Sequence, residues 1–125
     1  MTTQSPLSAA VTALRHEPIT AENVRLAVDE ANELIRYLNH ATLSWSAPAA
    51  LPLPADTTRL IGALHQIARH MHQTLGQAAE RIEVIGQDSE ETCLALERLR
   101  SARETLQEVT GQLGQAHAAA AQVSG

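Results

Sequence analysis

The sequence predicts an all-α protein, and three observations support that prediction. Of the 125 residues, 44% are hydrophobic and 18% are charged, which is enough apolar material for a packed core. Ala and Leu dominate the apolar set and Phe is absent, and such unbranched side chains lose less rotamer freedom in a helix than β-branched ones do. Apolar residues also recur at helical spacing in three long segments. Together these observations predict a three-helix bundle with a short N-terminal helix or arm.

The first 18 residues are expected to form the arm, and residues 19–122 are expected to form the bundle domain. Ser5 followed by Pro6 is typical of a helix N-cap and first turn. This pair predicts a short helix that ends at about Leu14.

The first long helix is predicted over residues 21–44, with Thr20 as its N-cap. Seven apolar residues of this segment fall on one arc at about 100° per residue. They are Val24, Ala27, Val28, Ala31, Leu34, Ile35 and Leu38. Residues 45–55 follow as a connector, and their three prolines predict an extended, polyproline-like strap because proline lacks an amide donor. An alternative role for this connector is as a proline-rich ligand for an aromatic groove.

The second long helix is predicted over residues 57–85, with Asp56 as its cap. Gly86 is expected to take the left-handed conformation that commonly ends a helix. The third helix is predicted over residues 89–121, after a short turn. Because short turns join antiparallel neighbours, these two helices should pack as a hairpin.

The third helix has a heptad pattern, which is typical of helices that supercoil around a neighbour. Two rows recur every seven residues. They are Thr92, Leu99, Leu106, Leu113 and Ala120, and Ala95, Ala102, Val109, Ala116 and Val123. From about Leu106 onward the helix is expected to extend past its neighbours and to need a partner, and residues 123–125 are expected to be a tail. The predicted interface residues are Leu99, Leu106, Val109, Leu113 and Ala116.

Composition limits the function classes open to the chain. The formal net charge is -5 at pH 7, so the averaged field repels phosphate and nucleic acid is not an expected partner.

The single cysteine, Cys93, cannot form an intramolecular disulfide, and its place beside the apolar arc predicts a buried side chain. No apolar stretch comes near the roughly 18 residues that span a bilayer, so we expect a cytoplasmic protein and no membrane partner. All 9 basic residues are arginine, which indicates a GC-rich bacterial genome.

Histidines are the most suggestive side chains for a ligand or metal site. His65 and His72 are seven residues apart and share a face at the border of the apolar arc of their predicted helix. A zinc pair on one helix normally has a spacing of three or four residues, as in H-E-x-x-H, and that spacing is absent. A third ligand would have to come from another helix, with His40 as a candidate. We therefore expect no metal site and no cofactor.

The sequence thus predicts a non-catalytic interaction or assembly module that uses its C-terminal helix as a coiled-coil surface. Enzyme activity is not expected, because no Gly-rich phosphate loop and no G-x-S-x-G elbow is present. The expected partner is a protein, with a second copy of the chain in a homodimer as the leading case. One alternative is a small regulatory helical domain that binds a ligand or metal through His65 and His72. Another is an accessory nucleic-acid-binding protein.

Overall fold

The computed structural model describes residues 5–124, and it confirms the all-α class. Every regular element in this range is a helix, and the range contains no strand. The chain divides into two compact units, Met1–Ala50 and Leu51–Gly125. Each unit is described separately below. Residues 1–4 of the predicted arm lie outside the described range.

The first unit contains the helices α1 (Pro6–Leu14), α2 (Ala21–Ala41) and α3 (Ala47–Ala50). Both predicted N-caps are confirmed, because each hydroxyl accepts a bond from an amide three residues later. The Ser5 Oγ accepts from the Ser8 amide at 3.1 Å, and the Thr20 Oγ1 accepts from the Asn23 amide at 3.1 Å. These bonds satisfy amide groups that otherwise have no partner in the first turn.

The apolar arc of α2 is largely uncovered within its own unit. Val24 and Val28 are more than half exposed, and no described residue of the first unit is buried. An amphipathic helix needs a second surface to cover its apolar side. The prediction that this helix packs as the third member of a bundle stays a prediction.

The connector is more helical than the sequence analysis predicted. Residues 45–55 were expected to be extended, but Ala47–Ala50 form α3 and the next helix begins at Pro54. Proline fits the first position of a helix because its fixed φ is already helical and its missing amide is not needed there. Asp56 is therefore not the N-cap but the third helical residue, where its Oδ2 accepts a bond of 3.0 Å from the Leu53 amide.

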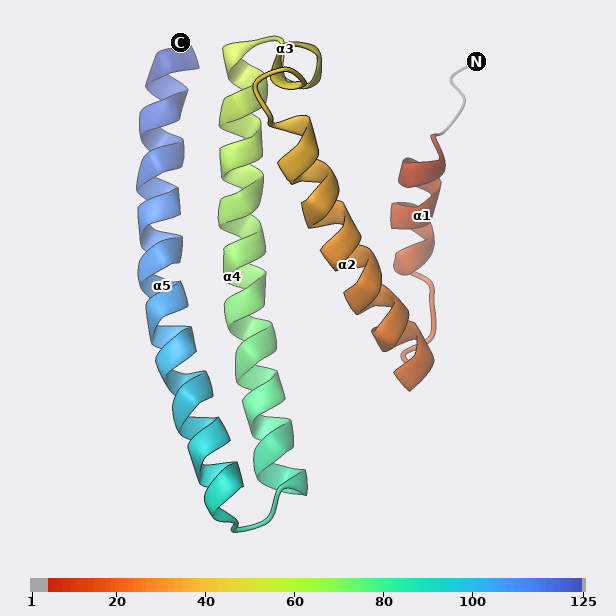
Figure 1. Cartoon of the computed structure of the whole chain (residues 1–125), viewed down its shortest axis with the longest axis vertical. Helices are drawn as coiled ribbons and strands as arrows, with labels where there is room; N and C mark the ends of the chain where they lie inside the picture. Colours follow the sequence, from red (N-terminus) through yellow and green to blue (C-terminus); the bar gives the residue numbers. More distant parts are fainter. Residues whose placement is uncertain (1–4, 125) are drawn as a thin grey trace. The chain divides into compact units, whose positions relative to one another are not determined.

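The second unit is an antiparallel hairpin of α4 (Pro54–Ile85) and α5 (Glu90–Ser124), which lie side by side in Figure 1. This packing confirms the predicted hairpin. The helices contain 32 and 35 residues, which corresponds to about 48 and 52 Å of length. The expected tail of residues 123–125 is shorter than predicted, because α5 continues to Ser124. Its last residue, Gly125, lies outside the described range.

A turn stabilised by one threonine joins the two helices. The Thr92 hydroxyl donates a bond of 2.7 Å to the Gly86 carbonyl, and the Thr92 amide donates to the Ser89 Oγ at 3.1 Å. Gly86 was expected to be left-handed, but its φ is -84°, and Gln87 takes the positive value of 55° instead. Position 86 requires glycine because a larger residue would clash with Thr92: a Cβ there would lie 2.5 Å from the Thr92 Oγ1.

Among residues 5–124, no helix is both long enough and apolar enough to cross a membrane.

Candidate interaction surface

The hairpin is held together by one row of partly or fully buried residues on each helix, which we call the seam. On α4 the row is Thr58, Ile61, His65, Ala68, His72, Leu75, Ala79 and Ile82. On α5 it is Thr92, Leu96, Leu99, Arg103, Leu106, Thr110, Leu113, His117 and Ala120. Both rows alternate spacings of three and four residues, which is the pattern of a two-helix coiled coil.

Contacts across the seam show that the two helices pair along nearly their whole length. Near the open end, the Thr58 Oγ1 donates to the Ala120 carbonyl at 3.2 Å. Midway along, the Arg103 Nε donates to the His72 carbonyl at 3.4 Å. The C-terminal half of α5 therefore does not extend past its neighbour, contrary to expectation. The physical reason is that Thr58, near the start of α4, lies at the level of Ala120.

Long polar side chains fit in the seam because glycines on the facing helix leave room for them. A Cβ on Gly62 would lie 2.8 Å from the His117 Nε2, and a Cβ on Gly76 would lie 2.9 Å from the Arg103 guanidinium. In the reverse direction, a Cβ on Gly114 would lie 3.2 Å from the His65 Nε2. These close approaches explain the glycines at positions 62, 76 and 114, although glycine is a poor helix former, whereas Gly111 faces open space.

The structure separates the five predicted interface residues into two groups. Leu99, Leu106 and Leu113 are partly buried in the seam. Val109 and Ala116 lie outside the seam, and Val109 is 40% exposed. In the seam, the row of these leucines is therefore combined with a second α5 row, which contains Leu96 and Arg103. Because this second row is largely polar, hydropathy does not identify it in the sequence.

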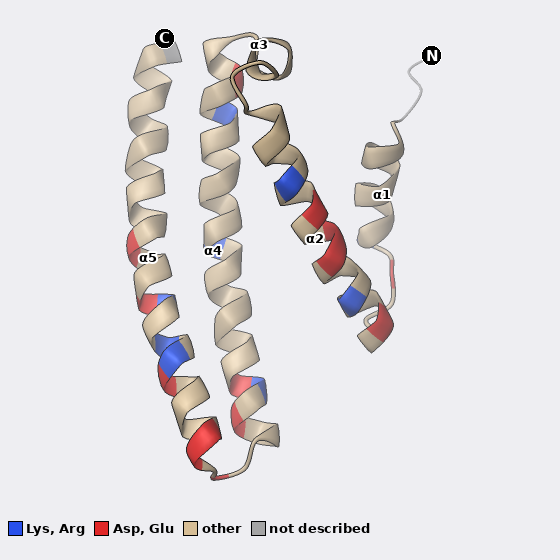
Figure 2. Ribbon diagram, in the orientation of Figure 1, with Lys and Arg blue, Asp and Glu red and all other residues tan. Residues whose placement is uncertain are grey.

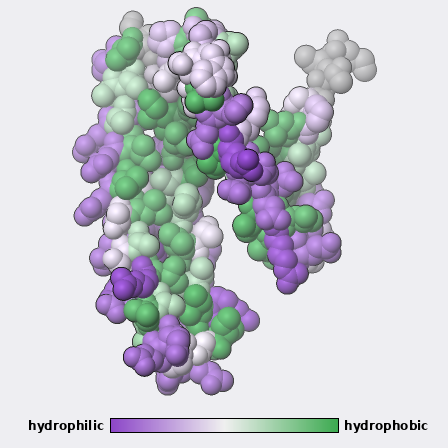
Figure 3. All heavy atoms as spheres, in the orientation of Figure 1, coloured by the Kyte–Doolittle hydropathy of each residue, from purple (hydrophilic) through white to green (hydrophobic). Residues whose placement is uncertain are grey.

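A second apolar row on each helix lies beside the seam, and we call this surface the free face. Its members on α4 are Leu60, Leu64, Ile67, Met71 and Ala78. Its members on α5 are Ala102, Val109 and Ala116. These residues repeat at helical spacing next to the seam rows, which places each set on one side of its helix. In the view of Figure 3, hydrophobic side chains run along much of the hairpin.

The centre of the free face is a groove of about 540 Å³ to which both helices contribute. Met71 stands on the α4 side, and Ala102 and Val109 stand on the α5 side. Leu75 and Leu106, which belong to the seam, also line it. The remaining lining residues are Arg98, Ser101 and Thr105. The shared groove shows that Met71 faces the same side of the hairpin as Val109 does.

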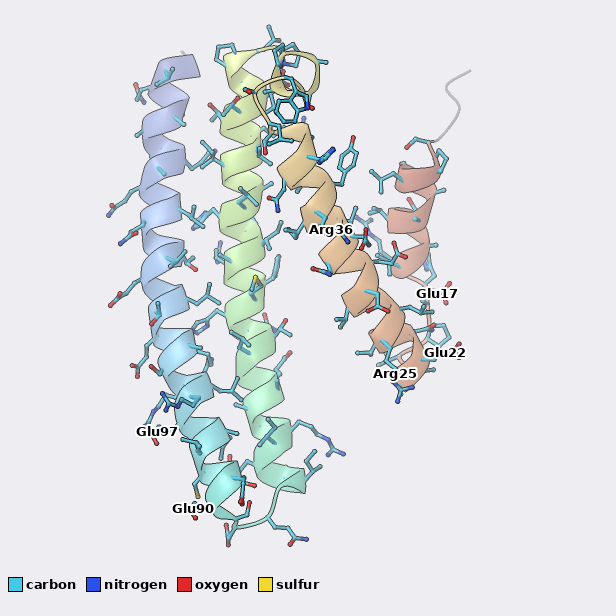
Figure 4. The ribbon with its side chains drawn as sticks, in the orientation of Figure 1. Glu17, Glu22, Arg25, Arg36, Glu90 and Glu97 are labelled. Atoms are coloured by element: carbon cyan, nitrogen blue, oxygen red, sulfur yellow. The ribbon has the colours of Figure 1, made fainter. Side chains whose placement is uncertain are left out.

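Polar residues line two hollows of the hairpin that do not belong to the free face. The first hollow has a volume of about 170 Å³ and is lined by Arg69, His72, Gln107 and Thr110. The second hollow is lined by Glu83, Cys93, Leu96, Glu97 and Arg100. Cys93 is exposed there, contrary to the prediction that it is buried. The α5 side chains Glu90 and Glu97 point outward near the turn in Figure 4.

The charged residues of the hairpin gather toward its turn. Figure 2 shows acidic and basic residues mainly at the end where α4 meets α5. Between Asp56 and Glu80, α4 has only Arg59 and Arg69 as charged residues, and α5 has none after Glu108. The α4 row of the free face lies mostly along this weakly charged part of the hairpin, whereas Ala102 of α5 lies among the charged residues that extend to Glu108.

The two candidate metal ligands of the hairpin lie two helical turns apart. His65 and His72 both lie in the seam, seven residues apart, whereas His40 belongs to the first unit. Within the part of the chain that the structure describes, no group of three His, Cys, Asp or Glu side chains could hold a metal ion. The ligand-binding alternative thus gains no support from the arrangement of these histidines.

Comparison with known proteins adds no assignment. No protein family, no curated protein and no solved structure matches the chain.

Proposed function

We propose that the chain is a non-catalytic helical interaction module, and that its hairpin binds another helical surface through the free face. The observation that supports this proposal most strongly is the apolar groove between Met71 and Val109, which nothing covers within the hairpin. Exposed apolar surfaces of this kind commonly mark interaction sites. A groove between two helices suits an amphipathic helix in particular.

The second apolar row supports the same proposal. A helix that packs against one neighbour needs one apolar row, and the seam already supplies it on both α4 and α5. Leu64 and Met71 on α4, and Ala102 and Val109 on α5, are additional to the seam and lie on one side. Helices inside a larger bundle have two such rows, because each contacts two neighbours.

The sparse interior of the chain favours a module that is completed by binding. Among the described residues, only Ala68 at 5% exposure and Thr92 at 9% are buried. A partner on the free face would remove Ile67, Met71 and Val109 from water, and burial of apolar area contributes about 25 cal/mol per Å². The proposal places this module in the cytoplasm, since its one cysteine needs no oxidising compartment.

The proposal can be tested with a photoreactive amino acid placed at single positions of the full chain in its native host. Ala102 lines the groove of the free face, and Gln107 lines the polar hollow beside Arg69. Both positions are exposed on α5, so the two variants form a matched pair. Irradiation is expected to give covalent adducts larger than the chain from Ala102 and few or none from Gln107.

The outcome does not depend on the identity of the partner. Adducts from Ala102 alone, with the chain itself or with another protein, would support an interaction module that uses the free face. Equal adducts from both positions would indicate nonspecific collisions. Equal adducts, or none from either position, would overturn the proposal.

A further inference from the structure

We infer that the partner on the free face is a second copy of this chain, and that two hairpins form a four-helix bundle related by a two-fold axis. The inference rests on the proposed function, because it names the partner of the same surface. It follows from the sizes of the side chains on the two helices and from the charge of the face.

The apolar side chains of the free face are mostly larger on α4 than on α5. On α4 they include Ile67 and Met71, which are 39% and 49% exposed. On α5 they are Ala102, Val109 and Ala116, and the polar residues Thr105 and Gln112 alternate with them on the same side. A large row packs best against a small one, because interiors reach full density when large and small residues alternate across facing positions.

A two-fold axis makes such a face complementary to itself. In a two-fold interface, the same patch is used on both copies, and an axis parallel to the helices places α4 of one copy against α5 of its partner. The large α4 side chains then meet the small α5 side chains in both halves of the interface. Each helix would have two helical neighbours, as in a four-helix bundle, and both of its apolar rows would be used.

The charge of the face fits an apolar partner of the same kind. The α4 row of the free face contains no charged residue, and Arg98 is the one charged residue lining the groove. A strongly charged partner surface would place unpaired charges against Ile67 and Met71, which is costly. A second free face presents only one charged residue in its groove, Arg98, and none in its α4 row.

The test uses the purified full chain in equilibrium sedimentation, with a variant that keeps the face apolar and changes only its size. Wild-type protein is expected to be a dimer at low micromolar concentration. Ala102→Leu should weaken dimerisation by at least about tenfold, because the added side chain overfills the small row. Gln107→Leu adds a similar apolar side chain outside the free face and is expected to leave the dissociation constant unchanged. Circular dichroism checks that both variants keep their helix content.

The possible outcomes separate this inference from the proposed function. If the wild-type protein stayed a monomer up to hundreds of micromolar, the inference that a second copy covers the free face would be wrong. Crosslinks from Ala102 to another protein in cells would still support an interaction module in that case. Tighter dimerisation of Ala102→Leu would also contradict the inference. A nonspecific apolar association becomes stronger when apolar area is added, whereas a closely packed interface becomes weaker. Weaker dimers of Gln107→Leu would place the interface on the other side of the hairpin and contradict it.

Discussion

Replacing Ala68 with lysine is expected to destabilise the hairpin more than any other single change to the seam. Ala68 is 5% exposed, and the seam around it contains His65, His72 and Arg103 but no carboxylate. An ammonium there would be buried without a partner, which costs roughly 3 to 5 kcal/mol. A unit of this size is stabilised by only about 4 to 11 kcal/mol, so the loss is a large share of the total.

Chemical denaturation monitored by circular dichroism would measure this effect, and the same α4 helix offers a matched control. Ala63 is exposed, so Ala63→Lys makes the same chemical change in solvent. The control is expected to change the free energy of unfolding by no more than about 0.5 kcal/mol. Equal stability of the two variants would mean that Ala68 is not enclosed by α5, and the described seam would be wrong.

Replacing Val109 with glutamate is expected to abolish self-association while the chain stays folded. Val109 is 40% exposed on the hairpin, so a carboxylate at this position stays hydrated in the monomer. In the proposed dimer it would be covered, and a two-fold interface would bury the charge twice. The dissociation constant should rise at least about 100-fold, which corresponds to roughly 2.8 kcal/mol.

Light scattering behind a sizing column would measure this change across a range of concentrations. Gln107→Glu introduces the same carboxylate on the same helix outside the free face, and its mass should match that of the wild type. If Val109→Glu remained a dimer, the free face would not be the contact surface. If Gln107→Glu alone became a monomer, the opposite side of α5 would be the interface.

The helices themselves could be predicted from local signals in the sequence. Ser5 and Thr20 are capping residues with a helical pattern behind them, and both caps are present. The hairpin could be predicted because only a few residues separate two long apolar patterns. The start of α4 is earlier than its sequence pattern predicts, because the prolines of residues 45–55 favour an extended strap, whereas Pro54 is the first residue of the helix.

The arrangement of the seam could not be read from hydropathy alone. Its second row on α5 includes Arg103, Thr110 and His117, which a hydropathy pattern assigns to the surface. The signal that could have located this row is the pair of glycines, Gly62 and Gly76, since glycine inside a helix indicates a close approach. The leucines were consequently assigned to an external interface, although they pack against α4. Val109 and Ala116 lie outside the seam, and their role in binding stays a prediction.

The left-handed residue of the turn illustrates a similar limit. Glycine is the usual residue with positive φ after a helix, which favoured Gly86. The structure shows that space near Thr92 decides the matter, so that glycine is needed at one position and the positive φ falls on Gln87. Only a contact between residues on different helices could have revealed this.

The most direct test of the central claim, that two copies cover each other's free face, is the reactivity of single thiols as the protein is diluted. In a Cys93→Ser background, Val109→Cys places the thiol on the free face and Gln107→Cys places it in the polar hollow. The thiol at position 109 should react slowly at concentrations where dimers form and several times faster after dilution. The thiol at position 107 should react at one rate throughout. Equal rates for position 109 at every concentration, or protection of position 107 instead, would contradict the account.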